Sequence, residues 1–559
     1  MMNYRFGKTA AGAGSVPAAC LYKPGKQSYG FLTEENRKEY QSLQIAELNS
    51  GYDTVYWAKN SFQTCIEEDE EGCFVVWDCM GEVPLTFVCE VPAEGNYKVD
   101  VSVYAKSDTE LLLFLGRRRL AARKKMVAGE HWTGSFVTNI CPIIPRTYTD
   151  AMDDLTLDVT LVGASVCLCE VCVNEWQGPT LYIAGDSTVT DQSADYPYLP
   201  GNSYSGWGQM LSAYVGASLA VSNHAHSGLT TESFRSEGHY DILQERIQAG
   251  DICLIQFGHN DQKLSHLLAE GGYKENLMRY IDEIKAKGAY PIIVTPLARN
   301  SWMGGSGAYN DLLEGYEKVC QEVGKACDIP VLELHKKSMA FVKAQGRESA
   351  KRYFFPSDYT HSNDYGAYLF AGYIYEELCE KGVLTTAGVD VANLQQPTEW
   401  MAPEVLPELE IPEECRMMEN PATEHLFENL ERPDEVLTRA DALEFIVTTM
   451  HFFPTNVYND MFTDVIGHET YAGTVECAWQ NGLIPESLIE NHTLQPMREV
   501  SIETFVELLL NGYATRKDLP EGETALIQAQ RLGIVDEAAD SSKLITREQA
   551  AQMCRQLKI

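Results

Sequence analysis

The sequence predicts an α/β protein: a three-layer αβα domain with a parallel sheet, preceded by an antiparallel β-sandwich and followed by a small α-helical domain. Three observations predict this. Between residues 179 and 390, apolar strand-like runs alternate with helical stretches, which is typical of a parallel sheet covered on both faces. Before residue 179, short β-rich runs are punctuated by Gly, Pro, Asn and Asp. Beyond residue 436 the pattern is helical.

The composition is that of a globular protein with several domains. The chain has 559 residues, of which 45% are hydrophobic and 22% charged. Its 44 Lys and Arg against 80 Asp and Glu give a net charge of −36, which repels nucleic acid and anionic membranes. We therefore expect no nucleic-acid partner and a neutral or locally steered substrate.

The sequence also suggests a cellular location. The N-terminus lacks an apolar run of signal-peptide length, and nowhere do eighteen apolar residues follow one another, so we expect no membrane span. The 16 cysteines are scattered, which suits a reducing compartment. These features favour a cytoplasmic location, with the cell surface or secretion as the alternative.

Residues 1–178 are expected to form the β-sandwich, with carbohydrate binding or shielding of the next domain as its role. The strand-like runs are 74–77, 85–91, 97–104, 111–115 and 155–162. Cys167, Cys169 and Cys172 lie in a further strand-like run and are interpreted as core residues rather than as half of a zinc site, because no second pair completes four ligands.

One basic cluster stands out in this region, namely Arg117, Arg118, Arg119, Arg123, Lys124 and Lys125. Such a patch would attract a polyuronate chain even on an acidic protein, because exposed charges act only over a short range. The alternative, which we favour, is a solvated hairpin end.

Residues 179–390 are expected to alternate five strands with helices. The strands are 181–184, 217–222, 251–257, 291–295 and 330–333, and the helices are 207–215, 239–249, 274–287, 309–326 and 365–381. Residues 391–436 are rich in Pro and Glu and are interpreted as a linker along the surface. In 437–559, helices are expected to begin after Thr438, Ser501 and Thr546, and these similar starts indicate an internal repeat.

Reactive side chains follow the strands of the predicted parallel sheet. Ser187 follows the first strand, Gly228 the second and Asn260 the third, while Asp358 and His361 precede the last helix. In such sheets ligands bind at the carboxyl ends of the strands. Ser187 is suited to be a nucleophile, His361 its base and Asp358 the group that orients the imidazole. The backbone N–H groups of Ser187 and Gly228 and the amide of Asn260 could stabilise an oxyanion.

These four stretches, in this order, resemble the SGNH (GDSL-type) hydrolase superfamily. Gly185-Asp186-Ser187 matches its first block, Gly228 its second, Gly258-His259-Asn260-Asp261 its third, and Asp358 with His361 its last. The resemblance implies a Ser187, His361, Asp358 triad and oxyanion donors from Ser187, Gly228 and Asn260. It implies no cofactor.

A finer resemblance, over residues 180–385, is to rhamnogalacturonan acetylesterase-like enzymes. It is carried by Gly-Asp-Ser-Thr at 185–188, Thr-Asp-Gln at 190–192, Gly-Trp-Gly-Gln at 206–209 and Phe-Gly-His-Asn-Asp at 257–261. The implied reaction is removal of acetyl esters from plant cell-wall polysaccharide or oligosaccharide, such as rhamnogalacturonan in pectin. Candidate substrate-binding residues are Asp186, Trp207, His259, Tyr204 and Trp302, the aromatic ones by stacking on sugar rings.

A metal site at His224, His226 and His259 is the less favoured alternative for these stretches, so we expect no metal.

The C-terminal region resembles surface-layer homology repeats. One full copy runs from Phe462-Thr-Asp-Val through Leu494-Gln-Pro to the helix after 500, and partial copies lie near Thr438-Arg439 and Thr546-Arg547. The resemblance implies attachment to a cell-wall polymer; a structural or carbohydrate-contacting role is equally compatible with the sequence.

The sequence thus predicts a serine carbohydrate O-acetylesterase. The alternatives are a xylan or other acyl esterase or lipase of the same superfamily, and a non-catalytic carbohydrate-binding surface protein. The polar stretches 190–206 and 299–308 argue against the apolar lid expected of a lipid esterase.

Overall fold

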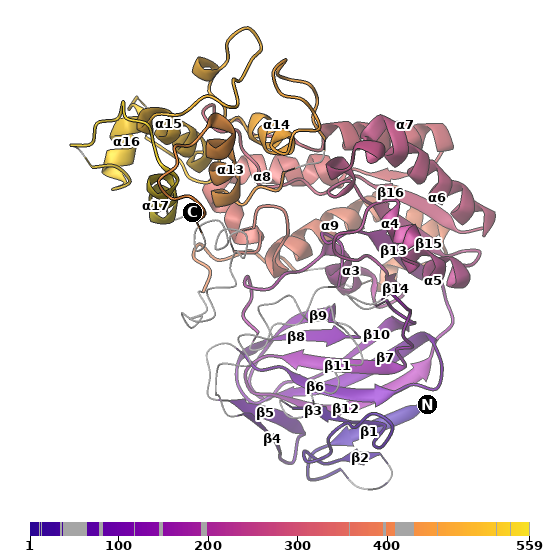
Figure 1. The fold of residues 1–559 in the computed structure, drawn as a ribbon. Coiled ribbons are helices and arrows are strands. Elements are labelled where there is room, and N and C mark those ends of the chain that lie inside the picture. The colour runs from indigo at the N-terminus through magenta and orange to yellow at the C-terminus, as the bar shows by residue number, and fades with distance from the viewer. Residues whose placement is uncertain are drawn as a thin grey trace.

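A computed structural model shows how the chain is arranged (Figure 1). It describes residues 1–557 except 11, 13, 34–35, 37–63, 78–81, 117, 145–148, 192–197, 357, 395–397, 408–429, 455–456, 521 and 537. Two sheets at the N-terminal end are followed by a parallel sheet flanked by helices, here called the central domain (residues 180–393), and by a cluster of helices, here called the C-terminal region (residues 430–557). The mixed α/β fold predicted from the sequence is confirmed.

The N-terminal region consists of two sheets, antiparallel except that β1 and β2 pair in parallel. One has the order β10-β7-β12-β1-β2, with β5 joined to β12 and β4 to β5, and the other has the order β3-β6-β11-β8-β9. The strands are β1 (Met2–Phe6), β2 (Ser15–Val16), β3 (Tyr29–Leu32), β4 (Thr64–Glu68), β5 (Cys73–Trp77), β6 (Leu85–Glu90), β7 (Gly95–Ala105), β8 (Thr109–Leu115), β9 (Arg119–Met126), β10 (His131–Ile140), β11 (Thr156–Val162) and β12 (Val166–Glu175).

Alternate residues of these strands fill one core between the two sheets. Val99 and Val101 of β7, Phe87 of β6 and Leu113 of β8 are fully buried in it. This is the period of two expected of strands with one buried face. The three cysteines at 167, 169 and 172 lie on β12, and the first of them is fully buried.

Apart from the exposed Lys125, the described residues of the basic cluster after β8 form neither a solvated hairpin end nor a free cationic patch. Arg118 pairs with Asp364 at 3.0 Å and Arg119 lies 3.8 Å from Asp191, with all four side chains almost completely buried. Arg123 pairs with Glu110 of the neighbouring strand β8, and Lys124 pairs with Glu130 in the turn between β9 and β10. Both interpretations of the cluster are therefore wrong for Arg118 and Arg119; Arg117 lies outside the described residues.

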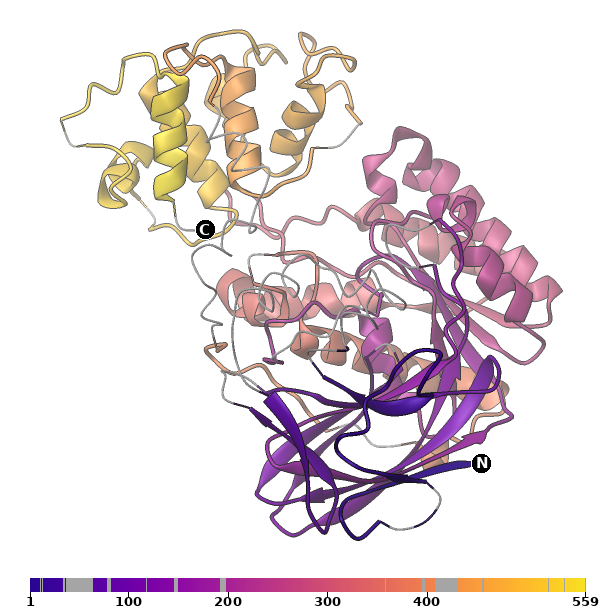
Figure 2. The same ribbon diagram turned by 60° about the horizontal axis from the view of Figure 1, so that its bottom comes forward.

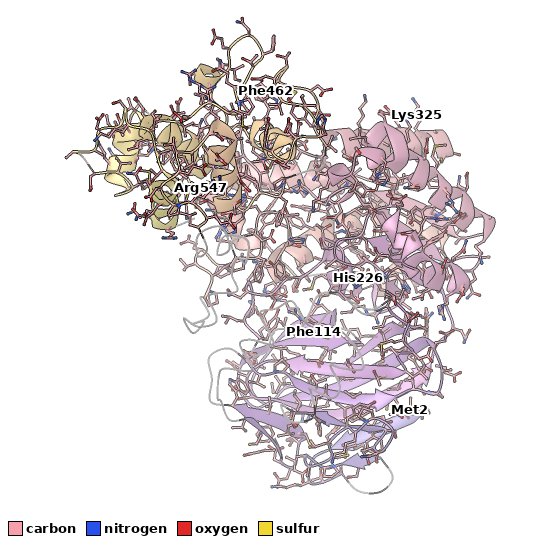
Figure 3. The ribbon with its side chains drawn as sticks, in the orientation of Figure 1. Met2, Phe114, His226, Lys325, Phe462 and Arg547 are labelled. Atoms are coloured by element: carbon pink, nitrogen blue, oxygen red, sulfur yellow. The ribbon has the colours of Figure 1, made fainter. Side chains whose placement is uncertain are left out.

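Apolar side chains complete this interface. Phe114 of β8 and Leu120 of β9 belong to the same buried cluster as Trp207 of the central domain. Figure 3 shows Phe114 at the end of the N-terminal sheets that faces the central domain. The paired arginines can be buried there because each has a carboxylate partner.

The central domain is built on a five-stranded parallel sheet of order β14-β13-β15-β16-β17. Its strands are β13 (Thr180–Gly185), β14 (Ala220–Asn223), β15 (Ile252–Gln256), β16 (Tyr290–Val294) and β17 (Val331–Leu332). Its helices are α3 (Trp207–Val215), α4 (Ser233–Ser236), α5 (His239–Arg246), α6 (Lys274–Ala286), α7 (Glu314–Cys327), α8 (Leu334–Ala350), α9 (Asp364–Glu380) and α10 (Val383–Thr386).

Helices cover both faces of the parallel sheet (Figure 2). Leu181 and Ile183 of β13 pack with α3, α8 and α9, whereas Tyr182 and Ala184 pack with α5, α6 and α7. Both faces of a strand are apolar here because neither meets water.

Two helices differ from the prediction. The segment 334–350 forms α8, which the sequence analysis did not identify. It contains several charged residues and a glycine at 346 with φ of +74°, so its helical periodicity is weak. Helix α7 begins at Glu314 rather than at 309, because Tyr309 pairs with Trp302 in an isolated β-bridge and the Asp311 carboxylate accepts a hydrogen bond from the Leu313 N–H.

Part of the Pro- and Glu-rich segment packs firmly on the two preceding units. Trp400 is 7% exposed and stacks edge-on against Tyr365 and Tyr368 of α9, while Arg123 of β9 donates to the Glu399 carbonyl at 2.9 Å. Residues 408–429 lie outside the described part.

None of the described helices combines the length and the apolar composition needed to span a membrane.

The C-terminal region contains α13 (Arg439–Thr449), α14 (Ala472–Gln480), α15 (Ile502–Tyr513), α16 (Ala525–Arg531) and α17 (Arg547–Gln556) around one core. The predicted caps are confirmed: Thr438, Ser501 and Thr546 each accept a hydrogen bond from the first turn of α13, α15 and α17.

The residues that precede these three caps are joined to one another. The N–H of Leu437 donates to Ile545, that of Ile545 to Val500, and that of Val500 to Leu437, at 3.0 to 3.1 Å. This closed ring of backbone hydrogen bonds relates the three starts in space as well as in sequence. The resemblance to surface-layer homology repeats stays a prediction.

Candidate active site

The strand ends of the parallel sheet bring the predicted site residues to one edge. Ser187 comes two residues after β13, Gly228 lies in the loop after β14, and Asn260 follows β15. Because β13 pairs in parallel with both β14 and β15, the loops after these three strands emerge side by side.

Ser187, His361 and Asp358 form a chain of short hydrogen bonds. The Oγ of Ser187 lies 2.7 Å from Nε2 of His361, and Nδ1 of His361 lies 2.7 Å from Oδ2 of Asp358. The other oxygen of Asp358 accepts the backbone N–H groups of Thr360 and His361 at 2.7 and 2.9 Å. The side chain of His361 is 30% exposed, so solvent and substrate can reach it.

The electrostatics suit a base held by a carboxylate. Burial alone would raise the pKa of Asp358 by disfavouring its ionised form. His361 and the backbone N–H groups stabilise the ionised form more strongly and lower the pKa of Asp358 to about 2. Burial likewise disfavours the imidazolium of His361, yet the Asp358 carboxylate raises the pKa of His361 above its ordinary value. Asp358 is therefore ionised wherever His361 titrates.

Gly228 and Asn260 flank the serine on the neighbouring loops. Gly228 is exposed and has φ of +85°, a conformation that favours glycine. The Asn260 amide donates one hydrogen to the Leu229 carbonyl at 3.0 Å, and its Oδ1 accepts from Nζ of Lys263 at 2.9 Å. Because an amide carries two N–H hydrogens, this orientation leaves one for a further acceptor.

Three residues predicted to bind substrate are buried instead. Asp186 is fully buried; its Oδ1 accepts from the N–H and hydroxyl of Thr188, and its Oδ2 lies 3.3 Å from Nδ1 of His259. His259 is 2% exposed, and its Nε2 lies 2.9 Å from the Leu297 carbonyl. Trp207 is fully buried in the core and donates to the side chain of Gln256. The prediction of substrate contact is wrong for Asp186, His259 and Trp207, because strand-end packing occupies their side chains.

Tyr204 and Trp302 remain partly exposed. Tyr204 stacks on Phe355 with ring centroids 3.6 Å apart, and its hydroxyl lies 3.4 Å from Oδ2 of Asp358. Its position supports the loop that carries Asp358. Trp302 donates to the side chain of Asn300, with the Arg347 guanidinium 5.7 Å from its ring centre. Sugar stacking by either residue stays a prediction.

Two cations beside the site were missed by the sequence analysis. Lys263 contacts Asn260, and Nη2 of Arg299 lies 3.4 Å from the His259 carbonyl. Burial and the charge of Arg299 lower the pKa of Lys263. Among the described residues, neither forms an ion pair with a carboxylate. Lys263 ends the short helix η2 (Asp261–Lys263) and follows Asn260 by three residues, a spacing from which its contact with Asn260 could have been predicted. No sequence pattern near Arg299 predicted its place beside the site.

The histidines considered for a metal site are engaged separately. Nε2 of His224 lies 2.9 Å from the Ser222 hydroxyl, and Nδ1 of His226 lies 3.3 Å from the Ser227 carbonyl. In the described part of the chain, no three His, Cys, Asp or Glu side chains are grouped as metal ligands.

Comparison with known proteins identifies the family. Residues 183–369 match the GDSL-like Lipase/Acylhydrolase family. Rhamnogalacturonan acetylesterase RhgT of Bacillus subtilis is 32% identical over 216 residues, covering 36% of this chain and 90% of the relative. Probable rhamnogalacturonan acetylesterase YesY of the same species is 29% identical, covering 37% and 96%. Rhamnogalacturonan acetylesterase of Emericella nidulans is 27% identical, covering 36% and 86%. With its strand-end serine, histidine and aspartate, this chain belongs to the GDSL-like lipase and acylhydrolase family and is an esterase.

Proposed function

We propose that the protein is a carbohydrate O-acetylesterase that removes acetyl groups from rhamnogalacturonan or a related pectic chain. The observation that carries the proposal is the continuous hydrogen-bonded chain from Ser187 through His361 to Asp358, with 2.7 Å at each step. This is the arrangement that a weak hydroxyl nucleophile needs, because the base lies within hydrogen-bond reach and is itself oriented.

The reaction proceeds through an acetyl-enzyme. The Ser187 Oγ attacks the acetyl carbonyl carbon while its proton passes to Nε2 of His361. The tetrahedral intermediate then collapses, the bond to the sugar oxygen breaks, and His361 returns the proton to that oxygen. In the second half, His361 takes a proton from water while the water oxygen attacks the acetyl carbon. The bond between this carbon and the Ser187 Oγ then breaks, His361 returns the proton to Oγ, and acetate leaves.

The negative charge that develops on the carbonyl oxygen requires donors. The backbone N–H groups of Ser187 and Gly228 and the remaining amide hydrogen of Asn260 fill this role in the proposed mechanism. Lys263 holds the oxygen of Asn260, so the amide nitrogen is the atom turned to the substrate. One such donor contributes about 10² to 10³ in rate.

Two features support an acidic sugar polymer over neutral xylan. Lys263 and Arg299 contact Asn260 and the His259 carbonyl, and neither forms a carboxylate ion pair within the described residues. The carboxylates of Asp186 and Asp358 act on both cations without direct contact, so a substrate carboxylate would supply a direct partner. Three of the curated relatives carry the name rhamnogalacturonan acetylesterase, one of them as a probable one.

The test is acetate release from three substrates: acetylated rhamnogalacturonan oligosaccharides, acetylated xylan and a medium-chain fatty ester. We expect hydrolysis of the pectic substrate, abolished in Ser187→Ala. A preference for xylan would move the substrate and keep the mechanism. Full activity in Ser187→Ala would overturn the mechanism, and no hydrolysis of any ester would favour the carbohydrate-binding alternative.

A further inference from the structure

The C-terminal region is in direct contact with the central domain. The N–H of Gly304 donates to the Asn481 carbonyl at 2.9 Å, and the Asn310 amide donates to the Gln480 carbonyl at 3.0 Å. A Cβ added at Gly304 would lie 2.4 Å from the Asn511 carbonyl oxygen, so the two backbones meet without space between them.

One side chain of this interface lies against the loop that carries the histidine and the aspartate. Arg516, in the turn after α15, is 4% exposed. Its guanidinium carbon lies 3.7 Å from the ring centre of Tyr359 and 4.4 Å from that of Phe452. Tyr359 is 9% exposed and occupies the position between Asp358 and Thr360 in the loop.

Hydrogen bonds hold Arg516 in this position. Its Nε and Nη2 both donate to the Met450 carbonyl, at 3.1 and 2.6 Å, and its own carbonyl accepts from Nζ of Lys351 at 2.7 Å. Arg347 binds the next residue in the same way, donating to the Lys517 carbonyl at 2.8 Å. The guanidinium is thus held by the Met450 carbonyl of its own region, and the backbone of residues 516 and 517 is held by the central domain.

The charge of Arg516 is not neutralised by a carboxylate contact in the described part of the chain. Burial lowers the pKa of Arg516 to about 10, so it is still a cation at neutral pH, and the acid that acts on it is Asp358. A buried charge acts over a longer range than an exposed one, because water does not screen it.

We propose that Arg516 is a positioning residue of the active site, through which the C-terminal region becomes part of the catalytic unit. By clamping Tyr359, it holds the loop that places Asp358 and His361 against Ser187. Its positive charge also favours the carboxylate of Asp358 and disfavours the imidazolium of His361. The inference rests on the roles proposed above for the triad, and on ester hydrolysis itself rather than on the identity of the sugar.

Arg516 acts on His361 together with other groups. The other titratable or charged groups that act on His361 or Asp358 are Asp186, His259, Lys263, Arg299, Tyr204, Tyr359 and, from the C-terminal region, His451. None of these is altered in the Arg516 variants or in their control, so a change in the pH profile of these variants reports on Arg516.

The experiment compares Arg516→Met and Arg516→Lys in the full chain, with Arg439→Met as the matched control. Arg439 is likewise buried in the C-terminal region, with 7% of its surface exposed against 4% for Arg516. Its guanidinium makes two hydrogen bonds to backbone carbonyls, those of Leu488 and Leu494, where Arg516 makes two to the Met450 carbonyl. Hydrolysis of 4-nitrophenyl acetate is measured across pH, and each preparation is normalised by titrating reactive serine with a fluorophosphonate. This ester carries no sugar, so failure of the pectic proposal would not affect the result.

We expect Arg516→Met to lose about 10²-fold in kcat with little change in KM, because misplacement of a catalytic group by about 1 Å has such an effect. The acidic limb of kcat/KM is expected to move to higher pH, since removal of a nearby cation favours the imidazolium of His361.

Arg516→Lys keeps the charge and loses the planar clamp, so it should retain the wild-type pH profile with a smaller loss in kcat. Arg439→Met should match wild type per reactive serine. The inference is overturned if Arg516→Met, or Arg516→Lys where the former does not fold, has the kcat of wild type per titrated serine, or if Arg516→Met leaves the acidic limb in place.

Discussion

The central domain contacts both the N-terminal sheets and the C-terminal region through buried arginines, but the arginines have different partners in the two interfaces. At the N-terminal sheets, Arg118 pairs with Asp364 and Arg119 with Asp191. At the C-terminal region, Arg516 has aromatic rings and a carbonyl around it and no carboxylate contact within the described residues. The electrostatic potential of a paired charge is weak at a distance because the partner cancels most of it, whereas an unpaired charge acts on the groups around it. The first interface therefore serves assembly, and the second is expected to influence catalysis.

The largest effect is expected for Asp358→Asn, which removes the group on which Arg516 acts. We expect kcat to fall about 10⁴-fold, since an amide holds the imidazole in the wrong tautomer. Without the carboxylate that raises its pKa, His361 should titrate lower, so the acidic limb should move to lower pH. Kinetics on 4-nitrophenyl acetate check both points.

The double variant Asp358→Asn with Arg516→Met sharpens this result. If Arg516 acts through the Asp358 loop, the combined loss should be smaller than the product of the two single losses. Strictly multiplicative losses would mean that the arginine acts elsewhere.

The next effect is on stability, for Arg118→Met at the paired interface. Leaving Asp364 buried without its partner should cost about 3 to 5 kcal/mol of unfolding free energy, measured by denaturant titration. The activity per titrated serine should stay close to wild type. The control is Arg118→Met with Asp364→Leu, which should regain much of the stability because no charge is left unpaired.

The loss of unfolding free energy in Arg118→Met should depend on pH. Burial raises the pKa of Asp364 even with Arg118 present, so the folded state holds this proton more tightly than the unfolded chain. Ionisation of Asp364 then costs stability as the pH rises, and loss of Arg118 enlarges the cost. The deficit should be smaller at about pH 5 than at pH 7; a deficit that grows on acidification would contradict the assignment.

A smaller effect is expected for Lys263→Met, the cation of the central domain nearest the proposed oxyanion donor. Loss of a charged hydrogen bond to Asn260 should lower kcat about tenfold. The charge of Lys263 lowers the pKa of His361, so its removal should move the acidic limb to higher pH, as for Arg516→Met. Lys263→Arg is the control that keeps the charge and should keep the limb in place.

The smallest effect is expected for Tyr204→Phe. The substitution keeps the ring stacked on Phe355 and removes the long hydrogen bond of 3.4 Å to Asp358. A loss of about threefold in kcat is expected, corresponding to a weak net hydrogen bond. A loss as large as that of Arg516→Met would place the support of the Asp358 loop in the central domain rather than in the C-terminal region.

The sequence was informative where structure depends on neighbours in the chain. The alternating apolar runs predicted strands β13, β15 and β16 nearly to the residue, and Thr438, Ser501 and Thr546 predicted the starts of three helices. Helix α8 was missed because charged residues and Gly346 weaken its period. Trp207 was assigned to the substrate because sequence alone does not separate a buried aromatic from an exposed one.

The reactive groups and the strand ends that carry them can be predicted from the sequence, because a glycine after an apolar run, or an aspartate three residues before a histidine, is a local arrangement. The partners of the buried charges depend on the fold: Arg118 meets Asp364, Lys263 meets Asn260, and Arg516 meets the loop of Asp358 and His361. The energy of a buried charge depends on the groups around it in space, and packing brings these groups together from distant parts of the chain.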